Sequence, residues 1–172
     1  MEKILISACL LGQRVRFDGA AAQVEDELLT RWIEEGRLVA ICPEVSGGLP
    51  VPRPSAELRG GSGADALDGR SLVVTASNTD VSEHFLAGAR AALELAQRHR
   101  IRVAVLKDRS PSCGSLQIYD GSFTRTRIGG EGVTAALLRR SGIRVFSEAE
   151  LPAAAAALAE LESALSGAAP RR

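Results

Sequence analysis

Three short apolar runs are each followed by a cysteine, and this pattern limits the possible folds more than any other feature of the chain. Each run has the length of a buried strand and ends at polar, Gly or Pro residues. If the strands are parallel members of one sheet, the three sulfurs gather at one edge, where open α/β sheets bind their ligands. The runs cover residues 4–6, 38–41 and 101–106, and the cysteines that follow them, the only three in the chain, are Cys9, Cys42 and Cys113.

The segments between these runs predict a single α/β, Rossmann-like domain in which helices flank a mostly parallel sheet. Val24, Leu28 and Trp32 form a stripe that predicts a helix over about residues 24–35. Strand, helix and strand in this order form a βαβ unit, whose crossover is almost always right-handed. The other predicted elements are a strand at 72–75, a helix at about 80–99 begun by a capping box of Asp80 and Glu83, a helix at 133–140 and a strand at 143–146.

Two insertions are predicted beside this core. Residues 43–69 are rich in Pro and Gly and predict a long loop, which we interpret as a lid or wall next to the cysteines. Asp120–Gly121 predicts a two-residue β-hairpin turn between strands at 116–119 and 123–128.

An alanine-rich helix is predicted at the C-terminal end. Ser147 and Glu150 form the capping box that starts it, and residues from Gly167 to Arg172 are expected to fray. The chain is therefore divided into a main domain, residues 1–147, and a C-terminal helix with its tail, residues 148–172.

The composition argues against a polymer or a membrane as the partner. The chain has 21 basic and 21 acidic residues, which leaves no net charge to attract nucleic acid or a membrane surface. Aromatic residues make up only 3%, too few for a base-stacking platform. No apolar run approaches the ~18 residues of a membrane span, and a strand begins directly after the first residues, without space for a signal peptide. We expect a cytoplasmic protein, a monomer or small homo-oligomer, that binds a small molecule.

In the cytoplasm, cysteines bind metals or take part in redox chemistry more often than they form disulfides. Each cysteine alone is equally well explained as a small buried hydrophobic residue, but three at equivalent strand ends suggest a shared cofactor. Zinc sites usually need a fourth protein ligand or a histidine, and His84 and His99 lack the spacing of ligands. Three thiolates favour iron and sulfide. A cubane cluster normally takes four cysteines, so three leave one iron open to act as a Lewis acid.

Six motifs occur in order along residues 3–147: Ser7-Ala8-Cys9-Leu10-Leu11-Gly12, Arg16-Phe17-Asp18-Gly19, Cys42-Pro43-Glu44-Val45, Gly47-Gly48-Leu49-Pro50 followed by Pro52-Arg53-Pro54, Ser110-Pro111-Ser112-Cys113-Gly114, and Ile118-Tyr119-Asp120-Gly121. Together they resemble the family known as domain of unknown function 523, whose characterised members are thiouracil desulfidases. The resemblance implies an oxygen-sensitive [4Fe-4S] cluster held by three cysteines, which map onto Cys9, Cys42 and Cys113. It also implies removal of sulfur from 2-thiouracil or from 4-thiouracil-type nucleotides, with release of hydrogen sulfide.

The resemblance and the open iron suggest roles for further residues. A soft thiocarbonyl sulfur suits the open iron, and Glu44, two residues from Cys42, is the predicted base that takes a proton from the attacking water. Ser110 or Ser112 is predicted to hold the ring or the departing proton. No net electron transfer is required. The motif residues predicted to contact the substrate are Arg16, Asp18, Arg53 and Tyr119.

Simpler interpretations of the same residues remain open. Glu44 follows a proline and can cap a helix or face solvent, and Arg53 can be a solvated arginine on a surface loop. Ser110 and Ser112 can be turn residues that satisfy the local backbone. Lys107 and Asp108 can form a solvated pair. On these interpretations the six residues have no part in the chemistry.

Two other classes of function also remain open. In the first, the chain is a thiol redox or sulfur-relay enzyme in which Cys113 is the reactive thiolate. In the second, it is a nucleotide-binding module without chemistry, in which the glycine-rich turn at 129–132 and Arg14, Arg16 or Arg53 bind phosphate.

Overall fold

A parallel four-stranded sheet forms the centre of the molecule. The computed structural model describes residues 1–167. The strand order is β2-β1-β5-β8, and β1 pairs in parallel with both β2 and β5, so that Ile4 lies opposite Leu38 on one side and Val103 on the other. The predicted α/β fold with a mostly parallel sheet is confirmed. The strands are β1 (Ile4–Ser7), β2 (Leu38–Ile41), β5 (Val103–Leu106) and β8 (Arg144–Ser147).

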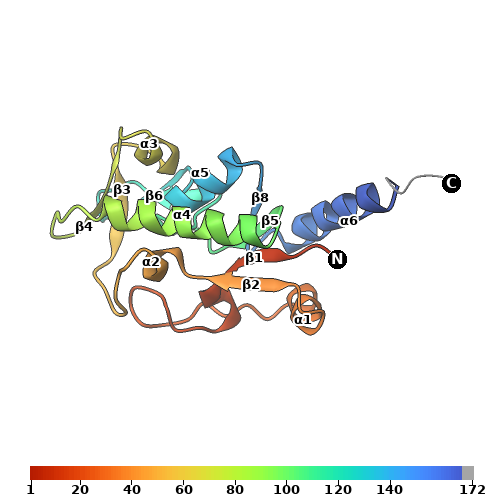
Figure 1. The fold of residues 1–172 in the computed structure, drawn as a ribbon. Coiled ribbons are helices and arrows are strands. Elements are labelled where there is room, and N and C mark those ends of the chain that lie inside the picture. The colour runs from red at the N-terminus through yellow and green to blue at the C-terminus, as the bar shows by residue number, and fades with distance from the viewer. Residues whose placement is uncertain (168–172) are drawn as a thin grey trace.

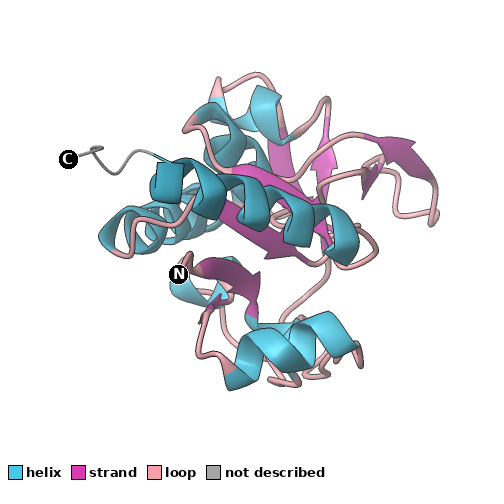
Figure 2. Ribbon diagram, turned by 90° about the vertical axis from the view of Figure 1, so that its right-hand side faces the viewer, coloured by secondary structure: helices cyan, strands magenta, loops and turns pink. Residues whose placement is uncertain are grey.

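Helices cover both faces of this sheet (Figures 1 and 2). Side chains alternate along β1, so Ile4 and Ile6 pack on α1 and α6, whereas Leu5 packs on α4 and α5. The interior of each layer is almost entirely aliphatic or alanine, which lets the helices approach the sheet closely. The helices are α1 (Glu27–Glu34), α4 (Ser82–Arg98), α5 (Val133–Arg140) and α6 (Leu151–Gly167).

Residues 43–69 contain regular structure, and the prediction of one long loop was wrong. The segment includes α2 (Pro43–Ser46), β3 (Ala56–Arg59) and α3 (Gly63–Leu67). Strand β3 pairs antiparallel with β4 (Leu72–Thr75), so β4 belongs to a separate two-stranded sheet. The strand was missed because each element has only four or five residues between Pro and Gly, too short for its periodicity to be recognised.

The hairpin is present, but its predicted two-residue turn is wrong. Strand β6 (Gln117–Tyr119) pairs antiparallel with β7 (Arg127–Gly129), and Tyr119 lies opposite Arg127, so residues 120–126 form the connection. The carboxylate of Glu57 accepts hydrogen bonds from the backbone N–H groups of Gly121 and Phe123, at 2.9 and 3.1 Å. This tertiary contact from β3 holds the loop open.

Helix starts were predicted with mixed success. Asp26 caps α1 by accepting from the N–H of Leu28, so α1 starts later than predicted. Asp80 accepts from the N–H of Ser82, but no capping box with Glu83 forms, and Val81 precedes the first turn of α4. The box before α6 includes the predicted contact: the carboxylate of Glu150 accepts from the N–H of Ser147 at 2.8 Å.

Two further predictions concern membrane-spanning helices and the C-terminal tail. Within residues 1–167, no helix is both long and apolar enough to cross a membrane. The predicted fraying covers residues 167–172: Gly167 is the last residue of α6, and residues 168–172 lie outside the described part of the chain.

Candidate active site

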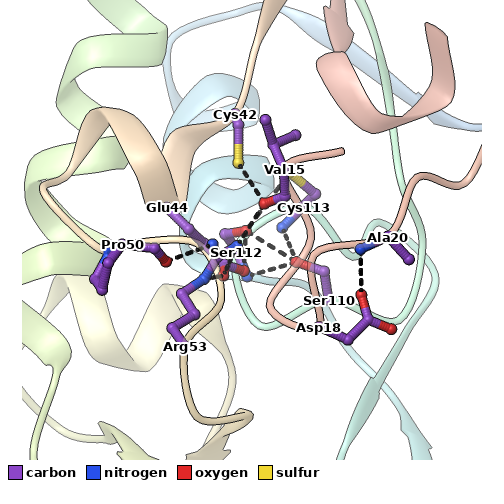
Figure 3. Close-up of polar contacts among 10 residues, drawn as sticks. All are labelled: Val15, Asp18, Ala20, Cys42, Glu44, Pro50, Arg53, Ser110, Ser112 and Cys113. Carbon is purple, nitrogen blue, oxygen red and sulfur yellow. Dashed lines mark hydrogen bonds and ion pairs between the residues drawn. The ribbon is translucent and has the colours of Figure 1, made fainter. Parts of the chain in front are cut away.

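The three cysteines lie at the carboxyl edge of three neighbouring parallel strands. Cys9 lies in the short 3₁₀ helix η1 (Ala8–Leu11) that follows β1, Cys42 directly precedes α2, and Cys113 lies in the loop after β5. All three line one cavity of about 630 Å³. Figure 3 shows Cys42 and Cys113 together with the polar residues around them. The order of the strands thus brings together sulfurs that are far apart in the sequence.

The N-terminus of α5 holds the Cys113 loop. The N–H groups of Val133 and Thr134 donate to the carbonyls of Pro111 and Ser112, both at 2.9 Å. These are amides that an α-helix leaves without an internal partner. Because the loop uses them, the interpretation of the turn at 129–132 as a phosphate cradle is wrong.

Gly132 allows this close contact. A Cβ atom on Gly132 would lie 2.5 Å from the carbonyl carbon and oxygen of Ser112. We expect Gly132→Ala to displace the Cys113 loop, to lower the free energy of unfolding by about 1–3 kcal/mol and to reduce the amount of iron that the protein retains. Urea unfolding and iron analysis measure the two effects. Gly129→Ala is the matched control, since nothing lies within 4 Å of its added methyl group. Equal stability and iron content in the two variants would contradict the assignment.

Helix α2 packs closely against α4 because a glycine lies at each of two contact points. A Cβ on Gly88 would lie 2.0 Å from the carbonyl oxygen of Pro43, and a Cβ on Gly47 would lie 2.0 Å from that of His84. The exposed His84 also places its Nδ1 2.9 Å from the carbonyl oxygen of Gly47. This backbone contact positions the segment that carries Cys42 and Glu44, which explains why small residues occur there.

Glu44 lies in a network of buried polar side chains (Figure 3). Its Oε2 forms an ion pair with the guanidinium of Arg53 at 2.7 Å, and its Oε1 accepts from the hydroxyl of Ser112 at 3.1 Å. The same Ser112 hydroxyl lies 3.6 Å from the sulfur of Cys113. Ser112 therefore connects the carboxylate with the thiol.

The hydroxyl of Ser110 contacts both the backbone and the hydroxyl of Ser112. Its Oγ accepts from the backbone N–H groups of Ser112 and Cys113, at 3.1 and 3.0 Å. Its own proton is then free for the Oγ of Ser112 at 2.9 Å, whose proton in turn points to Glu44. The hydroxyls thus form a directed chain that ends at the carboxylate, so Ser110 has a turn role as well as a place in this chain.

Burial makes two of the thiols weak acids. Burial, and next the neighbouring Cys42, raise the pKa of Cys9 to about 11. Burial also raises the pKa of Cys113 to about 12, although hydrogen bonds from Ser7 and Ser112 act in the opposite direction. A reactive redox cysteine requires a lowered pKa. The alternative in which Cys113 is a free reactive thiolate is therefore disfavoured.

The donor set is compatible with an iron–sulfur cluster. Among residues 1–167, no three His, Cys, Asp or Glu side chains are placed to bind a single metal ion. The cysteines of a cubane each bind a different iron, so they need a wider spacing than the ligands of one ion. Three soft sulfurs around one cavity, without histidine, fit a cluster better than zinc.

The four residues predicted to contact the substrate do not all line the cavity. Arg16, Arg53 and Tyr119 line the cavity. Asp18 does not line it, since its carboxylate accepts from the N–H of Ala20 in a local turn, at 3.0 Å. Arg53 is buried, so its interpretation as a solvated arginine is wrong, and the anion that it contacts is the carboxylate of Glu44.

Lys107 and Asp108 do not form a pair of side chains. The Lys107 ammonium pairs with Glu148. The Oδ1 of Asp108 accepts three backbone N–H groups, those of residues 115–117, at 3.1–3.2 Å. Although burial raises the pKa of Asp108, these hydrogen bonds bring it below its usual value. Asp108 therefore shapes the turn that follows Cys113.

Several cavity residues were not found from the sequence. They come from β1, from β3, from the loop after β5 and from the connection between β6 and β7, and their side chains reach the cavity through tertiary packing. No pattern in the sequence marks Glu57, which is buried like its neighbour Leu58. The residues are Ser7, Glu57, Arg109, Phe123 and Arg125.

Comparisons with known proteins show which family the chain is similar to. The sequence model of the 2-thiouracil desulfurase family matches residues 4–150. The chain belongs to this family. The chain is similar over 92% of its length to a solved structure, the [4Fe-4S]-dependent thiouracil desulfidase TudS, with 51% identity, a TM-score of 0.85 and 99% of that chain covered. It is also 45% identical to the uncharacterized protein YbbK of Bacillus subtilis (strain 168), over 86% of this chain and 97% of that protein.

These matches confirm the resemblance seen in the motifs and the expectation of an enzyme. The family and the solved relative are both named for the removal of sulfur from thiouracil, and the relative depends on a [4Fe-4S] cluster. An iron–sulfur cluster in this desulfurase is therefore supported by a relative with half of its residues identical.

Proposed function

We propose that this desulfurase is a [4Fe-4S]-dependent enzyme that converts a thiolated pyrimidine, 2-thiouracil or a 4-thiouracil-type base or nucleotide, to its oxo form. Water supplies the oxygen, and the sulfur leaves as hydrogen sulfide. One C–S double bond is replaced by a C–O double bond, so no electron donor or acceptor is needed. The observation that carries the proposal is the convergence of Cys9, Cys42 and Cys113 on a cavity that also contains Glu44 and Ser112.

Cys9, Cys42 and Cys113 would hold the cluster. A cluster bound by only three cysteines supplies an open iron that can bind a soft sulfur as a Lewis acid. Cluster binding would require Cys9 and Cys113 to lose the thiol protons that their raised pKa values otherwise retain. The cavity wall around them contains no other cysteine or histidine.

Glu44 is the proposed base. Its Oε1 is the oxygen that faces the serine hydroxyls, so it can remove a proton from a water molecule that attacks the ring carbon. The Ser112 hydroxyl lies within reach of both Glu44 and Cys113, so once Glu44 is protonated Ser112 can accept that proton and give its own toward the departing sulfur. Ser110 orients the Ser112 hydroxyl. The protons taken from water thereby end on the hydrogen sulfide.

The part of the cavity wall that carries aromatic side chains is proposed to bind the pyrimidine. Arg16 and Tyr119 line the cavity and are the proposed polar contacts of the base, and Phe17 and Phe123 add aromatic surface. Asp18 and Arg53 are not proposed as direct contacts, because their polar atoms are used by Ala20 and Glu44. The bound base would lie between the aromatic wall and the cysteines.

Anaerobic purification with iron and sulfide analysis tests the proposal. We expect the protein to contain iron and acid-labile sulfide, and to release hydrogen sulfide from a thiolated pyrimidine without added reductant, in proportion to its iron content. The assay follows loss of the thiocarbonyl absorption and formation of sulfide for 2-thiouracil, 4-thiouracil and their nucleotides. Sulfide release by iron-free protein that needs a thiol reductant would instead indicate a sulfur relay. Nucleotide binding without turnover, independent of iron, would indicate a binding module.

A further inference from the structure

All three nitrogens of the Arg53 guanidinium contact other groups of the protein. Its side chain is only 4% exposed. Nε donates to the Oε2 of Glu44 at 2.7 Å, and Nη2 lies 2.7 Å from the same oxygen. Nη2 also donates to the carbonyl of Val15 at 3.0 Å, and Nη1 to that of Pro50 at 3.1 Å. A guanidinium committed in this way has little capacity left to bind a substrate.

The contacts of Arg53 determine which carboxylate oxygen of Glu44 faces the hydroxyl of Ser112. Because Arg53 holds Oε2 through two nitrogens, the carboxylate cannot rotate freely, and Oε1 is left facing Ser112. The planar fork of arginine permits this two-nitrogen contact, whereas a lysine offers a single charged centre. We propose that Arg53 is a positioning residue that sets the orientation of the Glu44 carboxylate. This inference rests on the proposed role of Glu44 as the base.

The same guanidinium links Glu44 to the segment that borders the cysteines. The backbone N–H of Arg53 donates to the carbonyl of Phe17 at 2.8 Å. The carbonyl of Val15, which Arg53 also holds, lies 3.7 Å from the sulfur of Cys42. Arg53 therefore ties together α2 and the 15–17 segment, which approach each other only in the folded chain. Figure 3 shows the side chain of Arg53 with Glu44, Val15 and Pro50, and the carbonyl of Val15 next to Cys42.

A double-mutant cycle tests the proposal on anaerobically prepared holoenzyme with 2-thiouracil as the probe. Arg53→Gln should lower kcat about 100-fold, the cost of a small misplacement of a catalytic group, and leave KM within about threefold. Arg53→Lys should behave similarly, because the two-nitrogen contact is lost. In the Glu44→Gln background, Arg53→Gln should cause no further loss, because it acts through Glu44. Iron content and the visible spectrum should match those of the parent.

Arg70→Gln is the matched control, since Arg70 pairs with Asp65 and Asp68 on the surface and does not line the cavity. A rise in KM with unchanged kcat would overturn the inference and show that Arg53 binds substrate. Additive losses in the double variant would also overturn it. So would loss of the cluster in both Arg53→Gln and Arg53→Lys, because Arg53 would then hold the cavity wall. If Glu44→Gln itself keeps the parental kcat, the proposed function fails at its base, separately from the inference about Arg53.

Discussion

Replacement of Cys9, Cys42 or Cys113 by alanine is expected to abolish both cluster binding and turnover. Each cysteine follows a different strand, and no other cysteine exists in the chain to take its place. The two histidines offer no substitute, because neither His84 nor His99 lines the cavity. We expect each variant to lose the broad visible absorption of the cluster, its iron and its activity after anaerobic reconstitution.

Ser115→Ala provides a control for the substitution itself. Ser115 is buried in the same loop as Cys113, but its hydroxyl has no hydrogen-bond partner among the described residues. Its removal should therefore leave iron content and turnover close to those of the parent. Full activity in any one of the three cysteine variants would remove that residue from the proposed ligand set. Full activity in all of them would end the cluster hypothesis.

Glu44→Gln should lower kcat by about 10²–10⁴-fold, the usual contribution of a general base, while the cluster is retained. Glutamine has nearly the same shape, so α2 and the neighbouring Cys42 should stay in place. The amide cannot accept the proton of water, however. Steady-state kinetics under anaerobic conditions measure the loss, and iron analysis with the visible spectrum shows whether the cluster remains.

Glu2→Gln is a matched control for the loss of an arginine-paired carboxylate. Glu2 pairs with Arg102 at 2.7 Å, and its side chain is 10% exposed, compared with 13% for Glu44. It precedes β1, at the opposite end of that strand from Cys9, so it should leave kcat unchanged. A normal rate in Glu44→Gln would remove Glu44 from the proposed mechanism. Loss of the cluster in this variant would instead assign Glu44 to cofactor retention.

The main sheet and its cysteine edge could be predicted because their signals are local. Buried parallel strands appear as short continuous apolar runs, and residues 4–6 and 38–41 show this pattern directly. Their carboxyl ends must share one edge once they pair in parallel. The position of Cys9 and Cys42 relative to each other therefore followed from the order of strand, helix and strand.

The contacts around Glu44 could not be predicted in the same way. Arg53 was first interpreted as a contact for an outside anion, because a sequence shows the charge of a residue but not its partner. The fold provides a carboxylate inside the protein and buries the pair. Likewise, the turn at 129–132 has the composition of a phosphate cradle, yet its helix amides bind the Cys113 loop.

The amino-acid sequence by itself determined that this is an α/β protein with three cysteines at the ends of parallel strands. Its motifs also pointed to the desulfidase family. Only the tertiary structure decided which polar groups bind one another: Arg53 with Glu44, Ser112 with both Glu44 and Cys113, and α5 with the loop of Cys113. The physical reason is that strand formation depends on neighbours in the sequence, whereas a buried polar group is satisfied by whichever partner the packing of distant segments brings within hydrogen-bonding distance.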